Sequence, residues 1–458
     1  MSKKIPFIGI LFATATNMLM QTVVATILPQ ITDDLGGESL YGWAFSIFLL
    51  ASTITIPLFS KLADSYGYKK FFILGMTIFL IGSLLCGLSS SMLFFIMARM
   101  IQGLGVGALG PVTIALIATL FSIEDRGKAM GMYAAIQLLS NVLGPILGGM
   151  VAQRFGWNWA FYIVIPFRVL SILFIYRFTD PPTAFNRSLK YFDWIGAFIL
   201  GASIAMMIQA WTRLGETGFD SITLTLFIAS ILLLLFFVFQ EKKHEDPVIS
   251  PDLIRIRNVQ LANISAFLVG ILMYRAIAIL PLYANHVLGS GAVNSGKLLI
   301  PLMAGMGLGV IISGRIIKRF SYKSISVVGW IMSCISLAAL SVMSMIQEFN
   351  FISYIFIFLL GFGLGILLPT FLLPAQNAVS ESKQAVVGAM VQLSRNSGGA
   401  IGIPILTGLL AISDGSGRSG GYWFVFMFLT ASTVIGLILG LQYKGSIKEE
   451  MSQGTTNP

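Results

Sequence analysis

Long apolar runs alternate with short polar segments along almost the whole chain. A helix that crosses the hydrocarbon core of a bilayer needs roughly 17–25 mostly apolar residues. The pattern therefore predicts fourteen membrane-spanning helices. Their approximate limits are residues 5–29, 40–60, 71–90, 92–119, 129–153, 158–176, 193–211, 220–240, 259–285, 297–317, 324–345, 350–374, 384–412 and 421–443. The boundary between the third and fourth spans depends on one polar break, Ser89-Ser90-Ser91.

Composition excludes a soluble globular domain. Of the 458 residues, 56% are hydrophobic and only 10% are charged, and the mean hydropathy is +0.87. Soluble domains carry roughly 25% charged residues. Lipid tails solvate apolar side chains directly, and a helix satisfies its own backbone hydrogen bonds, so the composition predicts an all-α integral membrane protein.

The positive charges indicate a topology. If the N-terminus is cytoplasmic, twenty-one of the 29 Lys and Arg residues fall in cytoplasmic segments, as the positive-inside rule expects. The sequence thus predicts a multi-pass protein of the plasma membrane with both termini in the cytoplasm. The net charge of +10 is spread over short clusters without a basic arm, so we expect no nucleic-acid partner.

An internal repeat relates the two halves at an offset of about 255 to 258 residues. Eight or more identities fall in register, for example Gly103 with Gly361 and Gln137 with Gln392. We predict two six-span bundles that run in the same direction, at residues 1–180 and 252–446, with an inserted helix pair at 190–243 and a cytoplasmic tail at 447–458. Parallel repeats of this kind build secondary transporters whose substrate site lies near the midplane. The alternative is that glycine-rich spans look alike in any membrane protein.

Four local patterns carry a family resemblance. They are Lys61-Leu62-Ala63-Asp64-Ser65-Tyr66-Gly67-Tyr68-Lys69-Lys70, Arg99-Met100-Ile101-Gln102-Gly103-Leu104-Gly105, Gly144-Pro145-Ile146-Leu147-Gly148-Gly149 and Thr22-Val23-Val24-Ala25-Thr26-Ile27-Leu28-Pro29. In this order and spacing they resemble the major facilitator superfamily, and within it the fourteen-span drug:H⁺ antiporter branch. The resemblance implies multidrug efflux by alternating access, with antiport of protons.

Several motif residues have a physical reason for their type. A turn at Gly67 allows the preceding carboxylate, Asp64, to face helix N-termini or a cation as a gate latch, although a solvated turn explains it too. Gly144, Gly148 and Gly149 allow close helix contact, and Pro145 kinks the span; the alternative is generic helix packing. By resemblance, Gln102 and Gly103 belong to the gating motif of the fourth span.

Four arginines fall within predicted spans, where a charge normally faces a cavity or a partner. By resemblance, Arg99 is a candidate for proton coupling, and Arg395 also matches a family position. Arg275, which follows Tyr274, is a candidate for the substrate cavity, with snorkelling or a bond to a backbone carbonyl as the alternative. We interpret Arg168 as structural.

Carboxylates are missing from the middle of the predicted spans. All nineteen acidic residues fall at span ends, in loops or in the tail, and Met20 stands where the branch commonly carries Asp. A cavity lined by arginines should therefore favour neutral, zwitterionic or anionic compounds. Proton coupling is assigned to Arg99 and to groups at the outer mouth, Asp33, Asp34 and His286, which ordinary loop solvation also explains.

Uncharged polar residues within the spans complete the predicted cavity. Asn17 and Gln21 are four residues apart and share one helix face. The same spacing recurs in Gln137 with Asn141 and in Gln392 with Asn396, and hydrogen bonding between helices is the alternative interpretation. The predicted cavity residues are Asn17, Gln21, Gln137, Asn141, Tyr274, Arg275, Gln392, Arg395 and Asn396.

The sequence therefore predicts a secondary active exporter of small amphipathic compounds, driven by protons. Its partners are a small-molecule substrate, protons or sodium, and membrane lipid, and we predict a monomer. The alternatives are a specific transporter of an anionic metabolite, or a sodium-coupled or uncoupled facilitator. The chain has no metal-spaced His/Cys set and no nucleophile–base pair, so we predict that it is not an enzyme and has no cofactor or metal site. It has no phosphate-cradling loop, which argues against ATP as the driving force, and a receptor would not need duplicated halves.

Overall fold

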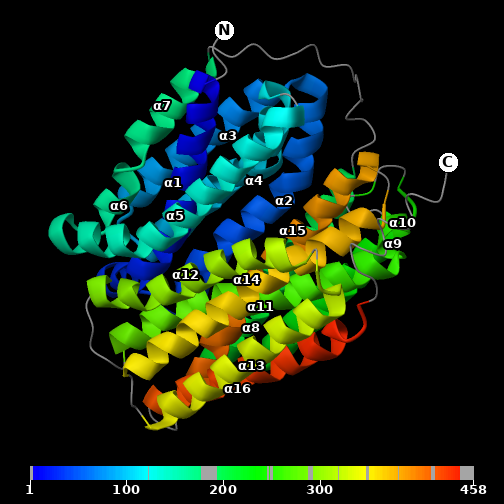
Figure 1. The fold of residues 1–458 in the computed structure, drawn as a ribbon. Helices are drawn as coiled ribbons and strands as arrows, with labels where there is room; N and C mark the ends of the chain where they lie inside the picture. The colour runs from blue at the N-terminus through cyan, green and yellow to red at the C-terminus, as the bar shows by residue number, and fades with distance from the viewer. Residues whose placement is uncertain are drawn as a thin grey trace. The chain divides into compact units, whose positions relative to one another are not determined.

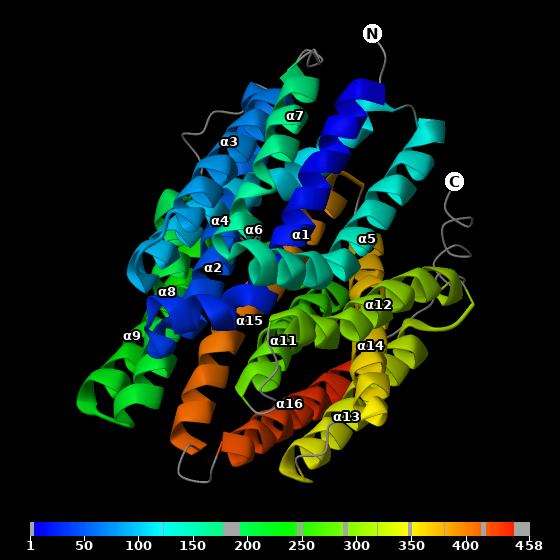
Figure 2. The same cartoon turned by 90° about the vertical axis from the view of Figure 1, so that its left-hand side faces the viewer.

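The computed structural model is helical over the residues it describes (Figures 1 and 2). These residues are 4–121, 123–176, 193–244, 247, 251–286, 292–317, 319–346, 350–379, 381–413 and 418–443. They divide into two compact units. The first comprises residues 1–212, 220–248 and 290–297, and the second comprises residues 213–219, 249–289 and 298–458.

Helices of the first half of the chain are long enough to cross a bilayer, apart from three short elements. In chain order they are α1 (Lys4–Leu35), η1 (Glu38–Leu40), α2 (Tyr41–Tyr66), α3 (Tyr68–Gly87), α4 (Met92–Leu120), α5 (Ile123–Phe155), α6 (Asn158–Tyr162), α7 (Ile165–Tyr176), α8 (Trp194–Thr217) and α9 (Ser221–Glu241).

The second half begins with a short helix and continues with six long ones. They are α10 (Pro251–Ile254), α11 (Arg257–His286), α12 (Ala292–Ile316), α13 (Tyr322–Ile346), α14 (Phe351–Asn377), α15 (Glu381–Ser413) and α16 (Arg418–Gly440).

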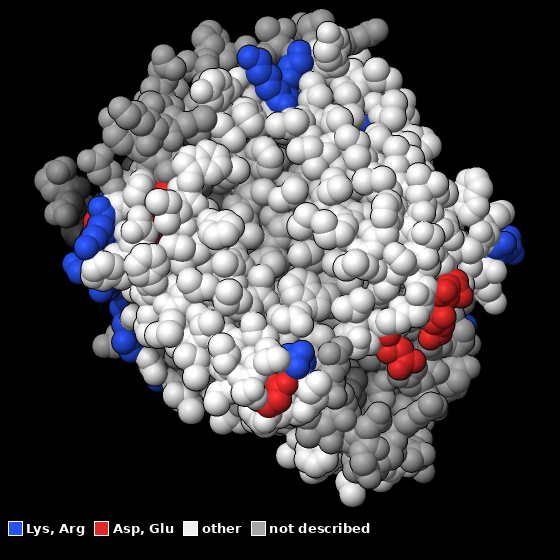
Figure 3. All heavy atoms as spheres, turned by 180° about the vertical axis from the view of Figure 1, so that it is seen from behind, with Lys and Arg blue, Asp and Glu red and all other residues white. Residues whose placement is uncertain are grey.

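Every predicted span overlaps a helix. Thirteen segments of the described chain are long and apolar enough to cross a membrane. The predicted span that is not among these thirteen is 384–412, which is α15; this helix has the length but carries Gln392, Arg395 and Asn396 in its middle. One face of the protein shows broad uncharged areas, with Lys, Arg, Asp and Glu mostly toward its margins (Figure 3). The chain is a multi-pass membrane protein with an all-α fold.

The structure tests the boundary between the third and fourth predicted spans and the continuity of the sixth. The break at Ser89–Ser91 is confirmed, because α3 ends at Gly87 and the Ser91 hydroxyl caps α4 by accepting from the Phe94 amide at 3.3 Å. The predicted span 158–176 is long and apolar enough to cross a membrane, and within it the helix is divided into α6 and α7 at residues 163–164. Pro166 explains the break, because proline lacks an N–H and its ring clashes with the carbonyl four residues earlier.

Contacts within each unit follow the sequence repeat. In the first unit, a Cβ at Gly103 would meet the Phe48 carbonyl on α2, and one at Gly105 would meet Gly75 and Phe79 on α3. In the second unit, Gly361 lies against Leu302 on α12, and Gly363 against Ser333 on α13. Glycine is needed at these positions because the backbones approach too closely for a side chain. The repeated glycines therefore make equivalent contacts in the two units.

The pair α8–α9 packs onto α2. Ser203 and Ser230 exchange hydroxyl-to-carbonyl bonds of 2.9 Å each, which join α8 to α9. Trp43 on α2 donates its ring N–H to the Gln209 side chain at 3.0 Å, and a Cβ at Gly201 would meet Ile54. The division into two bundles, an inserted pair and a tail remains a prediction.

Candidate functional site

Arg99 lies at the centre of a buried polar cluster that joins three helices of the first unit. Its guanidinium donates to the Gln102 side-chain oxygen and to the Ala44 carbonyl, the latter at 3.5 Å. Gln102 in turn donates to Ser83 on α3 at 2.8 Å. The guanidinium carbon lies 4.1 Å from the centre of the Phe48 ring, a cation–π distance. The charge of Arg99 is thus solvated by α2, α3 and α4 in place of water.

A second polar network joins α11 to α15 in the second unit. Gln392 donates to the Asn396 side-chain oxygen at 2.7 Å, and it accepts a bond from Arg395. The Tyr274 hydroxyl reaches the same Asn396 oxygen at 3.4 Å. The structure therefore brings together four of the nine predicted cavity residues.

Arg275 lies next to this network but has different partners. It is fully buried, its Nε donates to the Gly402 carbonyl at 2.5 Å, and its guanidinium carbon lies 4.8 Å from the Phe428 ring centre. Its two terminal nitrogens, Nη1 and Nη2, have no hydrogen-bond partner among the described residues. An arginine at the middle of a membrane helix costs about 2.5–3.5 kcal/mol on insertion scales, so incomplete pairing makes this position expensive.

The remaining four predicted cavity residues lie on α1 and α5, at the corresponding place in the first unit. Asn17, Gln21, Gln137 and Asn141 are all half-buried. The two helices touch through glycines: a Cβ at Gly144 would overlap the Thr22 hydroxyl, and one at Gly148 would lie 3.1 Å from the Val23 Cα. Pro145 and Gly149 lie in the same stretch of α5 and are buried.

Arg168 is buried beside α3, as a structural arginine would be. Its Nη1 donates to the Met76 sulfur at 3.0 Å, and its guanidinium carbon lies 3.5 Å from the Phe79 ring centre. A weak sulfur acceptor and an aromatic face compensate the charge only in part. Its Nε and Nη2 have no hydrogen-bond partner in the described part of the chain.

The groups assigned to the outer mouth and to the gate are only partly described. Asp33 and Asp34 are exposed in the last turn of α1. The side chains of His286 and Asp64 lie outside the described residues. Gly67 ends α2 and starts α3 with φ 105°, a conformation that favours glycine, and its amide donates to the Ala63 carbonyl at 2.9 Å.

Two buried carboxylates, Asp193 and Glu241, were not among the residues predicted from the sequence. Asp193 is 1% exposed and Glu241 is 4% exposed, at the start of α8 and the end of α9. Oδ1 of Asp193 accepts from the Gly196 amide at 2.7 Å, and both carboxylates approach Gly196. Their places at span ends were predicted, but their burial depends on the pairing of α8 with α9.

The partners of the arginines were predicted from the sequence only where they lie on the same helix. The spacing of Arg99 with Gln102, and of Gln392 with Arg395, is i to i+3, a signal for contact on one helix face. By contrast, Ser83, the Gly402 carbonyl and the aromatic rings of Phe48, Phe79 and Phe428 come from other helices. Sequence spacing gives no indication of them.

Comparison with known sequences gives consistent matches. The sequence profile of the Major Facilitator Superfamily matches residues 10–190 and 194–403. The chain is similar to Multidrug resistance protein 3 of Bacillus subtilis, with 34% identity over 370 residues, which cover 80% of this chain and 71% of that protein. It is also similar to Multidrug transporter protein MdtP of the same organism, with 29% identity over 410 residues, 89% of this chain and 75% of that one.

Comparison with solved structures supports the same architecture. An auto-inhibited POT family peptide transporter superposes with a TM-score of 0.71 over 97% of this chain and 98% of its own, at 14% identity. At that identity the likeness concerns the fold alone.

Proposed function

The chain belongs to the major facilitator superfamily, a family of transporters, and on that premise we propose that it exports small amphipathic compounds, including drugs, across the membrane. The names of the two Bacillus subtilis relatives support drug efflux. The observation that carries the proposal is the partly buried polar network of Tyr274, Gln392, Arg395 and Asn396, because polar groups inside membrane helices are costly and usually serve a transport path.

The substrate class follows from the charges. Arg99, Arg275 and Arg395 lie within spans, whereas the described acidic residues lie at helix ends. A path with fixed positive charges attracts neutral, zwitterionic or anionic compounds and repels cations. We expect such compounds to be exported in preference to quaternary ammonium dyes.

Proton antiport is the proposed driving force, with sodium coupling or no coupling as the alternatives. Arg99 is the proposed coupling residue, because a charge held by three helices senses a change in their packing. Asp33, Asp34 and His286 are the proposed groups that exchange protons at the outer mouth. Asp64, Gly67, Gln102, Gly103, Gly144, Pro145, Gly148 and Gly149 are the proposed gating residues.

We propose that the protein lies in the plasma membrane as a monomer, with both termini in the cytoplasm. Clusters of Lys and Arg in the corresponding loops support this orientation. Transport would then run from the cytoplasm or the inner leaflet to the outside.

A liposome assay tests the proposal. Purified protein is reconstituted, a pH gradient is imposed, and lumenal pH is followed while anionic, zwitterionic and cationic drugs are added. Proton flux that depends on an anionic or zwitterionic compound, and that is lost in Arg99→Ala, would support proton antiport. Arg99→Lys is the matched variant, because it keeps the charge but loses the planar fork that holds Gln102 and Ala44.

The outer-mouth assignment has its own test. Asp33→Asn together with Asp34→Asn should slow substrate-dependent proton flux while substrate binding remains. Proton flux equal to that of the unmodified protein at every pH would contradict the assignment. Flux that requires sodium instead of a pH gradient would favour sodium coupling.

A specific transporter of an anionic metabolite is a second candidate. The observation that favours it is Arg275, whose two terminal nitrogens have no partner among the described residues and would suit a carboxylate or phosphate. Transport of one anion class, with no response to other amphipathic compounds, would select this function over broad efflux.

A further inference from the structure

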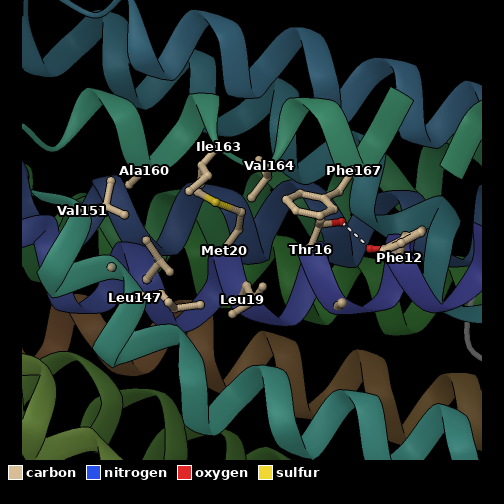
Figure 4. Close-up of a pocket in the computed structure, with 13 residues that line it drawn as sticks. Phe12, Thr16, Leu19, Met20, Leu147, Val151, Ala160, Ile163, Val164 and Phe167 are labelled. Carbon is tan, nitrogen blue, oxygen red and sulfur yellow. Dashed lines mark hydrogen bonds between the residues drawn. The ribbon is translucent and has the colours of Figure 1, made fainter. Parts of the chain in front are cut away.

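An apolar cavity of about 300 Å³ lies inside the first unit (Figure 4). Its walls come from α1, α5, α6 and α7, and it includes the break between α6 and α7. Met20 points from α1 toward Ile163 across the cavity. The lining residues are Phe12, Ala15, Thr16, Leu19, Met20, Val23, Leu147, Gly148, Val151, Ala160, Ile163, Val164 and Phe167.

The lining provides almost no polar interaction. Among the described lining residues, Thr16 alone has a polar side-chain group, and that hydroxyl already donates to the carbonyls of Phe12 at 2.9 Å and Ala13 at 3.0 Å. A charge or an unpaired polar group placed here would lose its hydration without compensation. The cavity therefore suits an uncharged aliphatic or aromatic group.

Its size and position indicate what enters it. Ligand pockets commonly measure roughly 300–1,000 Å³, so this cavity holds a small compound or one part of a larger one. At its edge, Leu147, Ile163 and Phe167 are 42%, 51% and 43% exposed, as side chains that face lipid are. A compound dissolved in the bilayer can thus reach the cavity without crossing water.

Polar side chains follow directly on the neighbouring face of α1. Asn17 and Gln21 come one residue after Thr16 and Met20, which corresponds to a rotation of about 100° around the helix. Both side chains are half-buried. An amphipathic compound can therefore place its apolar part in the cavity while its polar part stays near these amides.

We infer that this cavity binds the uncharged apolar part of the transported amphipathic compound. The inference rests on the proposed export function and adds a hydrocarbon-binding subsite to it. A lipid acyl chain has the same chemistry as the apolar part of a drug, so the test must separate these two sources.

The test uses the full chain in lipid nanodiscs and a small uncharged aryl diazirine as photoprobe, with labelled residues mapped by mass spectrometry. Unlabelled N-phenyl-1-naphthylamine, an uncharged aromatic amine, serves as competitor. If the cavity is the binding site, an excess of the competitor lowers labelling of residues 12–23 on α1 by about tenfold. A tenfold excess of sites occupied by competitor over sites left open to the probe corresponds to about 1.4 kcal/mol. Labelling of the lipid-exposed residues of α9 should not change.

Variants that fill the cavity test the same site independently. Val151→Phe and Ala15→Leu each add carbon atoms to a half-buried lining position. Both should abolish displaceable labelling of α1 and reduce export of uncharged aromatic compounds. Val169→Phe is the matched control, because it makes the same change on α7 at an exposed position outside the lining. Elution as a single species and an unchanged unfolding temperature verify folding.

Two outcomes would overturn the inference. If the amount of labelling does not change when the amine is added but does change with the acyl-chain length of the nanodisc lipid, the cavity is occupied by lipid tails. Displaceable labelling that persists in both filled variants places the binding site elsewhere. Export failure is separate: displaceable labelling without transport of any compound would reject the proposed function and leave the cavity as a binding site.

Discussion

The contact between α1 and α5 and the contact between α11 and α15 are built alike but contain opposite chemistry. Gly144 on α5 lies against Thr22 on α1, and Gly399 on α15 lies against Tyr274 on α11. The residues that follow, Val23 and Arg275, therefore occupy corresponding positions. In the first unit, Val23 lines an apolar cavity. In the second unit, the corresponding arginine is fully buried, bonds to Gly402 and lies against Phe428.

The difference teaches how one duplicated helix pair can acquire two roles. Glycines keep the backbones close in both copies, so the packing is preserved while single side chains change the lining. An open cavity loses dispersion contacts, and a buried charge loses hydration. Both are unfavourable for stability, which is typical of positions that are kept for binding.

Replacing Arg275 should have the largest effect on the comparison. Arg275→Met keeps much of the volume and removes the charge, so this position would become apolar, as Val23 is in the first unit. Transport of anionic and zwitterionic compounds should fall by about tenfold or more, since a hydrogen bond to a charged group contributes about 1.5–3 kcal/mol. Transport of uncharged compounds, measured in the same liposomes, should remain.

Arg168→Met is the control for this experiment. Arg168 is equally buried, but it stacks on Phe79 within the first unit and is not a predicted cavity residue. It should alter stability without changing the ratio of anionic to uncharged transport. If both variants changed that ratio equally, Arg275 would have no specific role in selecting charge.

Replacing the glycines at the two helix contacts should have the next largest effect. Gly144→Ala would drive a Cβ into Thr22, and Gly399→Ala would drive one into the Tyr274 ring. Each should lower the free energy of unfolding by about 1–3 kcal/mol, as overpacking commonly does. Thermal unfolding in detergent measures the loss. Gly110→Ala on α4 is the matched control, because nothing lies within 4 Å of its Cβ position; equal losses in all three would show that helix contact is not the cause.

Asn396 and Asn141 occupy corresponding positions, so replacing each of them compares the polar groups of the two helix contacts. Asn396 accepts from both Gln392 and Tyr274. Asn396→Ala should remove the side-chain oxygen that both donors share, at a cost of about 1–3 kcal/mol. Asn141→Ala, at the corresponding half-buried position, should cost less. A larger loss at Asn141 in the same unfolding assay would mean that α1 and α5 hold the more important network.

The smallest effect is expected from two serines that support these clusters. Ser83 accepts from Gln102 and is fully buried, whereas Ser394 donates to Asn263 at 2.8 Å and is half-buried. Replacement by Ala should cost about 0.5–1.5 kcal/mol at Ser83 and less at Ser394, where water can substitute. The difference in unfolding temperature between the two variants measures this, and a reversed order would contradict the role of burial.

Much of the fold was predictable because a membrane imposes length and composition on each helix. Apolar length located every span, and a polar break was enough to separate α3 from α4. The split of the span 158–176 could also have been predicted from Pro166. For the site, spacing on a single helix indicated the pairs Arg99–Gln102 and Gln392–Arg395, since residues three apart lie on one face.

By itself, the sequence determined that the chain is an all-α membrane protein with an internal repeat, and which residue types interrupt its apolar spans. Local periodicity and composition suffice for this, because every spanning helix must satisfy its own backbone and match the bilayer. The tertiary structure alone decided that Arg275 bonds to Gly402, that Asp193 and Glu241 are buried, and that Met20 borders an apolar cavity. These depend on which helices meet and at what height, and contacts between residues distant in the chain leave no periodic signal in the sequence.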